Sequence, residues 1–128
     1  MPVSVISAAR AVLVAALPGL EIVQTFPGTP ARRAIRLTRA GGGRGRDLDR
    51  PRLIVECFAA SAAGAPDGKQ AEKDAYIAYD ALRAAANGGP WAGAWITGWD
   101  GDNIVDFPDP DQTRHARWQF TGVLYLLT

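Results

Sequence analysis

RRAIRLTRAGGGRGRDLDRPRLIVECF, residues 32–58, is the stretch that decides the fold. Two strand-like runs flank a tip of glycine and arginine, which predicts a β-hairpin. In the first run, apolar and polar side chains alternate from Ala34 to Thr38, as expected of a strand with one buried face. The return run, Leu53 to Ala59, is apolar on both faces apart from Glu56. That composition is typical of a central strand covered on both sides.

The same hairpin concentrates positive charge. Eight of the twelve arginines lie between Arg32 and Arg52, where only Asp47 and Asp49 offset them, so this window carries +6 while the whole chain carries +1. A local basic patch on a nearly neutral chain predicts a surface that contacts a partner. Because residues 41–43 are all glycine, we expect the tip to lack a fixed shape until a partner orders it.

Length and composition narrow the class of protein. The 128 residues fit a single domain, 1–128, and the 48% hydrophobic and 21% charged content is ordinary for a globular protein. The lone cysteine, Cys57, excludes an internal disulfide and is expected to be a buried, inert thiol. The apolar opening, residues 1–17, has no basic leader and is too short to span a bilayer, so we expect a soluble protein with no membrane partner.

Two helices are expected around the hairpin. Ser4 is placed to cap a helix that ends at about Leu17, before Pro18-Gly19. Its apolar residues are distributed almost all round, which favours cover from more than one side, including a second subunit. A second helix, from about Lys69 to Asn87, carries an alanine-rich stripe on one side and charged residues on the other.

The remaining segments are expected to be strands and a loop. Glu21 to Phe26 reads as a short strand, Ala94 to Trp99 as another, and Arg117 to Leu127 as the last, after an acidic loop. The resulting order, α-β-β-β-α-β-β, predicts an α+β domain. In it, an antiparallel or mixed sheet is covered on one face by two helices.

The acidic loop invites a metal hypothesis. Its members are Asp100, Asp102, Asp106, Asp109 and Asp111. The spacing does not fit a calcium loop, because Ile104 occupies a ligand position and Val105 replaces the required glycine. A solvated loop without a metal ion is therefore the interpretation we favour.

The sequence offers little to support catalysis. The single histidine, His115, follows Arg114 and is expected to be a solvated surface residue. No triad, zinc or haem signature accompanies it, so we expect neither an enzyme nor a cofactor. Trp95 and Trp99 would share one face of a strand, where packing on the sheet is favoured over stacking on sugars or bases.

Charge segregation is the strongest functional signal. The basic hairpin and the acidic loop lie far apart in sequence, and in a ring built head to tail one copy's basic surface would meet the next copy's acidic surface. The candidate contact residues are Arg39, Arg44, Arg46, Arg50, Asp100, Asp102, Asp106, Asp109 and Asp111.

The ordered pattern resembles the tail terminator (tail completion) proteins of long-tailed phages. The features that carry the resemblance are the opening helix ending Leu17-Pro18-Gly19, the strand Arg36-Leu37-Thr38-Arg39 before the glycine-rich tip, Asp49-Arg50-Pro51 before Leu53-Ile54-Val55-Glu56-Cys57-Phe58, the alanine-rich helix from Gln70-Ala71-Glu72, and Val105-Asp106-Phe107-Pro108-Asp109-Pro110-Asp111 followed by Arg117-Trp118-Gln119-Phe120-Thr121. Together they cover nearly the whole chain. The tryptophan series at 91, 95 and 99 is not part of that pattern.

The resemblance implies a virion protein, assembled in the host cytoplasm, that forms a hexameric ring. Such a ring caps the tail tube, ends its polymerisation and joins it to the head–tail connector. Its implied partners are copies of itself, the tube protein, the connector or head-closure protein, and the genomic DNA that passes through the lumen. The alternatives are another neck or tail-tube component, a small nucleic-acid-binding module that uses the arginine hairpin, and a small enzyme with carboxylate chemistry around Asp100, Asp102 and Asp106.

Overall fold

The computed structural model describes residues 4–127, so the first three residues of the apolar opening and residue 128 lie outside it. The elements are α1 (Val5–Ala16), β1 (Glu21–Val23), β2 (Arg33–Arg44), β3 (Leu48–Ala59), α2 (Gly68–Ala85), β4 (Pro90–Trp91), β5 (Ala94–Gly101), β6 (Val105–Asp106) and β7 (Ala116–Leu127). The strands form one seven-stranded sheet in the order β1-β2-β3-β7-β5-β4, and β6 pairs with β7 next to β5. Only β1 and β2 pair in parallel, so the sheet is mixed.

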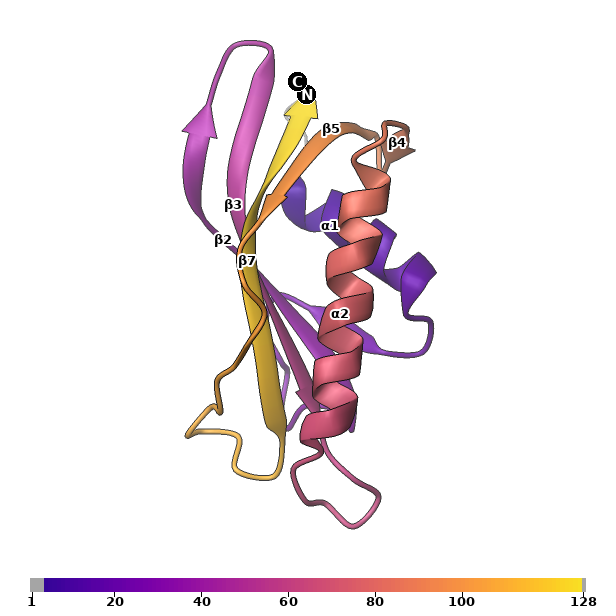
Figure 1. Cartoon of the computed structure of the whole chain (residues 1–128), viewed down its shortest axis with the longest axis vertical. Coiled ribbons are helices and arrows are strands. Elements are labelled where there is room, and N and C mark those ends of the chain that lie inside the picture. The colour runs from indigo at the N-terminus through magenta and orange to yellow at the C-terminus, as the bar shows by residue number, and fades with distance from the viewer. Residues whose placement is uncertain (1–3, 128) are drawn as a thin grey trace.

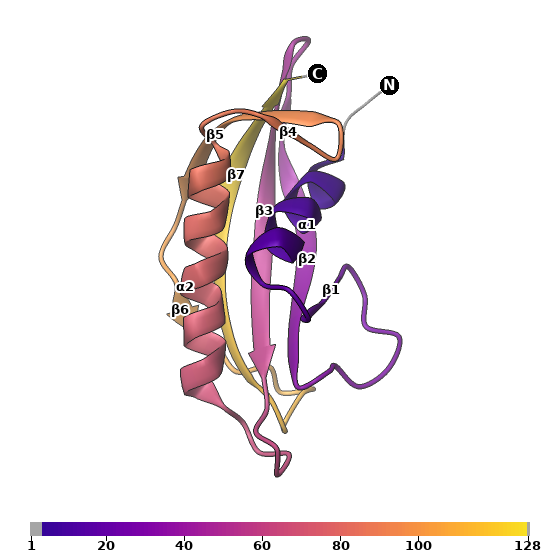
Figure 2. The same ribbon diagram turned by 90° about the vertical axis from the view of Figure 1, so that its right-hand side faces the viewer.

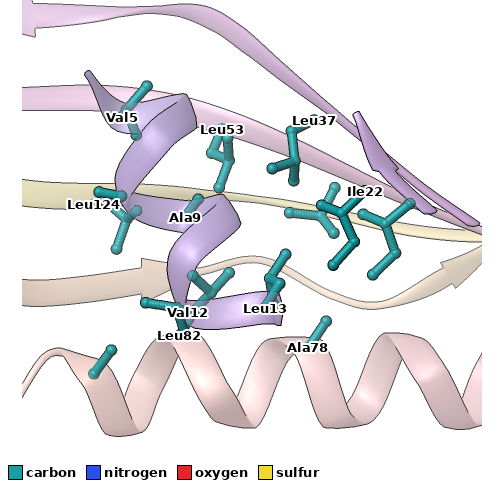
Figure 3. Close-up of a cluster of buried hydrophobic side chains, with 14 of the residues drawn as sticks. Val5, Ala9, Val12, Leu13, Ile22, Leu37, Leu53, Ala78, Leu82 and Leu124 are labelled. Carbon is teal, nitrogen blue, oxygen red and sulfur yellow. The ribbon is translucent and has the colours of Figure 1, made fainter. Parts of the chain in front are cut away.

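Both helices lie on the same face of the sheet, as the sequence predicts (Figures 1 and 2). Figure 3 shows the core between them, where Val12 and Leu13 of α1 meet Leu82 of α2 above Leu37 and Leu53 of the sheet. These side chains are buried because helix and strand each direct one apolar face toward the other layer. The predicted α+β architecture is therefore confirmed.

The first helix has the predicted start and a partly open surface. The Ser4 hydroxyl accepts a hydrogen bond from the backbone N–H of Ser7 at 3.2 Å, which caps the first turn. Five residues of α1 are buried: Val5, Ala8, Ala9, Val12 and Leu13. Val14 remains 41% exposed, so within one chain the apolar surface of α1 is only partly covered.

The glycine-rich tip is more ordered than the sequence suggests. β2 continues through the glycines, with Gly42 opposite Pro51 and Gly43 opposite Arg50, so the expectation of a shapeless tip is wrong. A β-bulge follows Arg39, and the pairing of β2 with β3 resumes at Gly42. Gly41 and Gly42 make the bulge possible because they adopt φ of +87° and +102°. At Gly42 any side chain would also collide with the backbone of Arg50. Glycine here fixes the shape of the hairpin and does not loosen it.

A second bulge, in β5 between Ile96 and Gly98, changes the face on which Trp99 lies. Trp99 packs edge-on against Tyr79 of α2 and Phe120 of β7, with ring centroids 5.6 and 6.0 Å apart. Trp95, before the bulge, is 48% exposed. The prediction that Trp95 and Trp99 share a face is therefore wrong, because one extra residue inverts the alternation.

Candidate assembly surface

The face of the sheet opposite the helices carries a cluster of two arginines and two carboxylates. Arg36 donates two hydrogen bonds to Glu56, Nε to Oε1 at 2.9 Å and Nη2 to Oε2 at 2.8 Å. Arg117 donates from Nη1 to the same Glu56 Oε2 at 2.6 Å. Asp109 Oδ2 lies 3.6 Å from both guanidinium groups. The cluster is formally neutral, and its hydrogen bonds to Glu56 raise the pKa of Arg36 above its ordinary value.

Aromatic rings enclose this cluster and attach two loops to the sheet. The Arg36 guanidinium lies over the rings of Phe26 and Phe58, at 5.7 and 5.3 Å from their centroids. The Arg117 guanidinium lies 5.0 Å from the Phe107 centroid and donates from Nε to the Phe107 carbonyl at 2.6 Å. Because Phe26 and Phe107 belong to loops, the cluster holds both loops on the outer face. Sequence analysis did not identify this site, and its one visible signal was Glu56 in an otherwise apolar strand.

Two further hairpin arginines neutralise buried carboxylates. Arg33 forms a two-point ion pair with Asp74 of α2, and Arg39 forms one with Asp49 of β3. Each of these carboxylates is 1% exposed, and burial without a cation would be costly. Arg39, predicted to be an assembly contact, is thus already paired within its own chain. Asp74 was not singled out by the sequence, because its partner is distant along the chain.

The basic hairpin and the acidic loop meet inside one subunit. Arg36 approaches Asp109, and Arg52 approaches Asp102, each pair at 3.6 Å. Asp102 also accepts a hydrogen bond from the Thr121 hydroxyl at 3.0 Å. Part of the segregated charge is therefore paired within one subunit, where the sequence suggested a contact between copies. The pairing of β3 with β7 brings the two segments together although they are far apart in sequence.

The other predicted contact residues lie on the surface. Arg44 and Arg50 at one end of the sheet, and Asp100, Asp106 and Asp111 elsewhere, are exposed and form no ion pair with any part of residues 4–127. Arg46 is exposed at the hairpin tip. In Figure 1 the tip stands at the upper end of the molecule, and the loop that leads into β7 lies at the lower end. Of the exposed carboxylates, Asp111 lies in that lower loop, whereas Asp100 lies in β5 on the row of Arg52.

His115 is not the solvated residue that the sequence predicts. It is 6% exposed, and its Nε2 lies 2.9 Å from the Ala31 carbonyl, which fixes Nε2–H as the donor. Its ring meets Phe58 edge-on at 6.4 Å. The prediction is wrong because the loop before β7 folds over the sheet, which local sequence does not reveal. His115 therefore links the loop before β7 to the loop before β2 through a hydrogen bond.

Chemistry-bearing groups do not converge elsewhere in the described residues. No three or more His, Cys, Asp or Glu side chains of residues 4–127 are grouped as metal ligands would be. Cys57 is fully buried, as predicted. Within the same residues, neither helix has the length and apolar character needed to cross a bilayer.

These features define a single α+β domain with a curled mixed sheet, two helices on one face and an ion-pair cluster on the other. A solved structure described as "Virion of native gene transfer agent (GTA) particle" contains a chain of the same fold. The two chains superpose with a TM-score of 0.66 at 14% sequence identity, over 98% of this chain and 96% of the other. No protein-family model matches the sequence, and no curated protein matches it either.

Proposed function

We propose that this protein is a structural component of a phage-like virion. It would form a ring that caps the tail tube, ends tube polymerisation and joins the tail to the head connector. The observation that carries this proposal is the full-length correspondence, 98% of one chain and 96% of the other, with a chain of a gene transfer agent virion. The tail-terminator pattern in the sequence supports the finer assignment to the end of the tail. In this role the protein acts through its surfaces and catalyses nothing.

The distribution of charge supports a protein partner for the hairpin. Arg33, Arg36 and Arg39 form ion pairs with carboxylates of the same chain. The positive charge that these pairs do not neutralise lies near the tip, around Arg44 and Arg50. A ring of such tips facing the lumen would hold DNA, since non-specific contacts reach about 10⁻⁴ to 10⁻⁶ M and repeated copies strengthen them. A tube that must release its DNA is better served when these arginines dock on protein.

Charge reversal at the tip tests this role in particle assembly. The double variant Arg44→Glu with Arg46→Glu is expected to yield tails of uncontrolled length or tails that fail to join heads, as counted in electron micrographs. Arg83→Glu, on the exposed surface of α2, is the matched control and is expected to assemble normally. Normal tail length and normal joining by the double variant would show that the hairpin tip is not an assembly contact.

A nucleic-acid-binding module is the second candidate. It is favoured by Trp95, which is 48% exposed and lies, through the rows of the sheet, at the same end as the hairpin tip. An exposed tryptophan at the same end of the sheet as the arginine-rich tip suits stacking on an unpaired base. A steep fall in DNA affinity of the isolated protein with rising salt would favour this candidate over the ring.

A further inference from the structure

Two edges of the sheet are open at the same level. β1 covers β2 only from Ala34 to Arg36, so the outer edge of β2 from Leu37 to Arg44 has no pairing strand among residues 4–127. At the opposite edge, β4 covers only the first two residues of β5, so the outer edge from Ile96 to Gly101 is equally open in the described chain. An open edge is a row of unpaired backbone donors and acceptors that accepts another strand.

The register of the sheet places these two open edges at the same level along the strands. One row of paired residues runs from Arg44 through Asp49 and Leu126 to Ile96. A second row runs from Arg39 through Leu53 and Gly122 to Gly101. The open part of β5, Ile96 to Gly101, is therefore level with Arg39 to Arg44 of β2, whose open part extends two residues further, to Leu37.

The two edges also match in length. Between those two rows the inner strands β3 and β7 each advance by four residues, whereas β2 and β5 each advance by five. The additional residue is the bulge, near Ala40 in β2 and near Thr97 in β5. Bulges discourage pairing with an ordinary strand. The two edges therefore span these rows with the same number of residues, five, whereas a regular strand would span them with four.

Charge on the outer face distinguishes the two edges. The Arg50 guanidinium lies over Gly43, with Nη2 3.5 Å from the position that a Cβ would occupy. Because Gly43 has no side chain, the Arg50 side chain can extend across β2 toward its open edge. Asp100 is in register with Val123, and Val123 with Arg52, so Asp100 shares the face of Arg52 and therefore of Arg50. One edge thus presents a cation and the other a carboxylate on the same face.

We propose that β2 of one copy, over Arg39 to Arg44, pairs with β5 of the next copy, over Ile96 to Gly101, so that the sheet continues from subunit to subunit. This inference rests on the proposed function, because it gives the subunit contact of the ring. Each neighbour along the path from β2 to β5 is antiparallel, so the two edges run in opposite directions. Copies related by a rotation would join them as an antiparallel pair, with Arg50 of one copy and Asp100 of the next on the same face of the continued sheet, Asp100 on the row of Arg52.

A disulfide cross-link tests the pairing and its register. Aligned by the two rows, Ala40 of one copy faces Asp100 of the next, so the variant Ala40→Cys with Asp100→Cys should form intersubunit disulfides on oxidation. Within one chain these positions are separated by β3 and β7, about 14 Å at the usual strand spacing, which is too far for an internal bond. The native Cys57 is buried and does not interfere.

The single variants and a displaced cysteine are the controls. Both substituted positions are exposed, so a thermal melt is expected to show that each variant folds. The double variant should give a ladder of covalent oligomers at low ionic strength, and an equal mixture of the two single variants should give dimers only. Ala40→Cys with Asp80→Cys, which moves one cysteine to α2, should give neither.

Two results would overturn the pairing. One is the absence of cross-links in the double variant, and the other is a covalent dimer of Ala40→Cys alone, which would indicate β2-to-β2 contact. Micrographs of the same samples separate this inference from the proposed function. Rings without cross-links would retain the ring and remove this edge contact, whereas a cross-linked ladder that never closes would retain the contact and remove the ring.

Discussion

At the scale of single residues, Glu56 organises the outer face. It binds Arg36 and Arg117 together, and these hold the loops that carry Phe26 and Phe107. The carboxylate is 7% exposed, so it has exchanged water for two guanidinium groups. The hairpin arginines therefore include some that maintain the fold, such as Arg36, and others, Arg44 and Arg50, that form no ion pair within residues 4–127.

Removal of the Glu56 carboxylate should destabilise the protein strongly. In Glu56→Ala, Arg36 and Arg117 lose their hydrogen-bonded counter-charge and keep only Asp109, at 3.6 Å, and we expect a loss of about 3 kcal/mol in the free energy of unfolding. Urea denaturation measures it. The control is Asp80→Ala, which breaks the exposed pair with Arg83 and should cost less than about 0.5 kcal/mol. Equal losses in the two variants would show that the cluster is not a structural tie.

The Cys57 thiol should be unreactive toward thiol reagents in the folded protein. Burial raises its pKa, so the reactive thiolate is suppressed and reagent cannot reach the sulfur. We expect a thiol reagent to label the native protein only as fast as it unfolds, and to label it at once in denaturant. Ala40→Cys supplies an exposed thiol that should react immediately without denaturant. Rapid labelling of Cys57 in native protein would contradict the packing of β3.

At the scale of elements, the two bulges set the character of the sheet edges. The bulge in β2 needs Gly42, whose φ is +102° and whose neighbours leave no room for a side chain. The bulge in β5 directs Trp99 into the core, where its ring fills the space above Gly122. Both edges thereby gain a shape that an ordinary strand does not match.

The variant Gly42→Ala should disturb the hairpin. The added methyl would lie within collision distance of the Arg50 carbonyl in a backbone conformation that alanine rarely adopts, so we expect a loss of about 2 kcal/mol. Gly28→Ala is the matched control, because nothing lies within 4 Å of its added methyl and its φ is not in the positive region. Chemical denaturation compares the two, and an unchanged Gly42→Ala would show that the bulge tolerates other conformations.

The sequence predicted the elements better than their contacts. Both helices and their caps followed from local chemistry, and Leu53 to Ala59 was recognised as central because it is apolar on both faces. The bulges were not predictable, since a single extra residue leaves the composition of a strand unchanged. The pairs Arg33–Asp74 and Arg36–Glu56 depend on strand register and on how a helix crosses the sheet, and neither is visible in spacing along the chain.

At the scale of the whole molecule, the exposed arginines of the hairpin tip and the exposed carboxylates Asp100, Asp106 and Asp111 lie on different parts of the surface, so copies should attract one another in a defined order. Contacts between exposed charges weaken when the screening length falls to about 8 Å at physiological ionic strength and below that at higher salt. We therefore expect the purified protein to form rings more readily at low salt. Sedimentation velocity across a salt series measures this. Ring formation that does not respond to salt would argue against a mainly electrostatic contact.

The most direct test of the ring itself is electron microscopy of the purified protein at low salt, with averaging of end-on views. We expect closed rings of a single size with an open lumen and six repeats. A homogeneous population of monomers or two-fold dimers under these conditions, with no rings, would contradict the proposed role at the end of the tail tube.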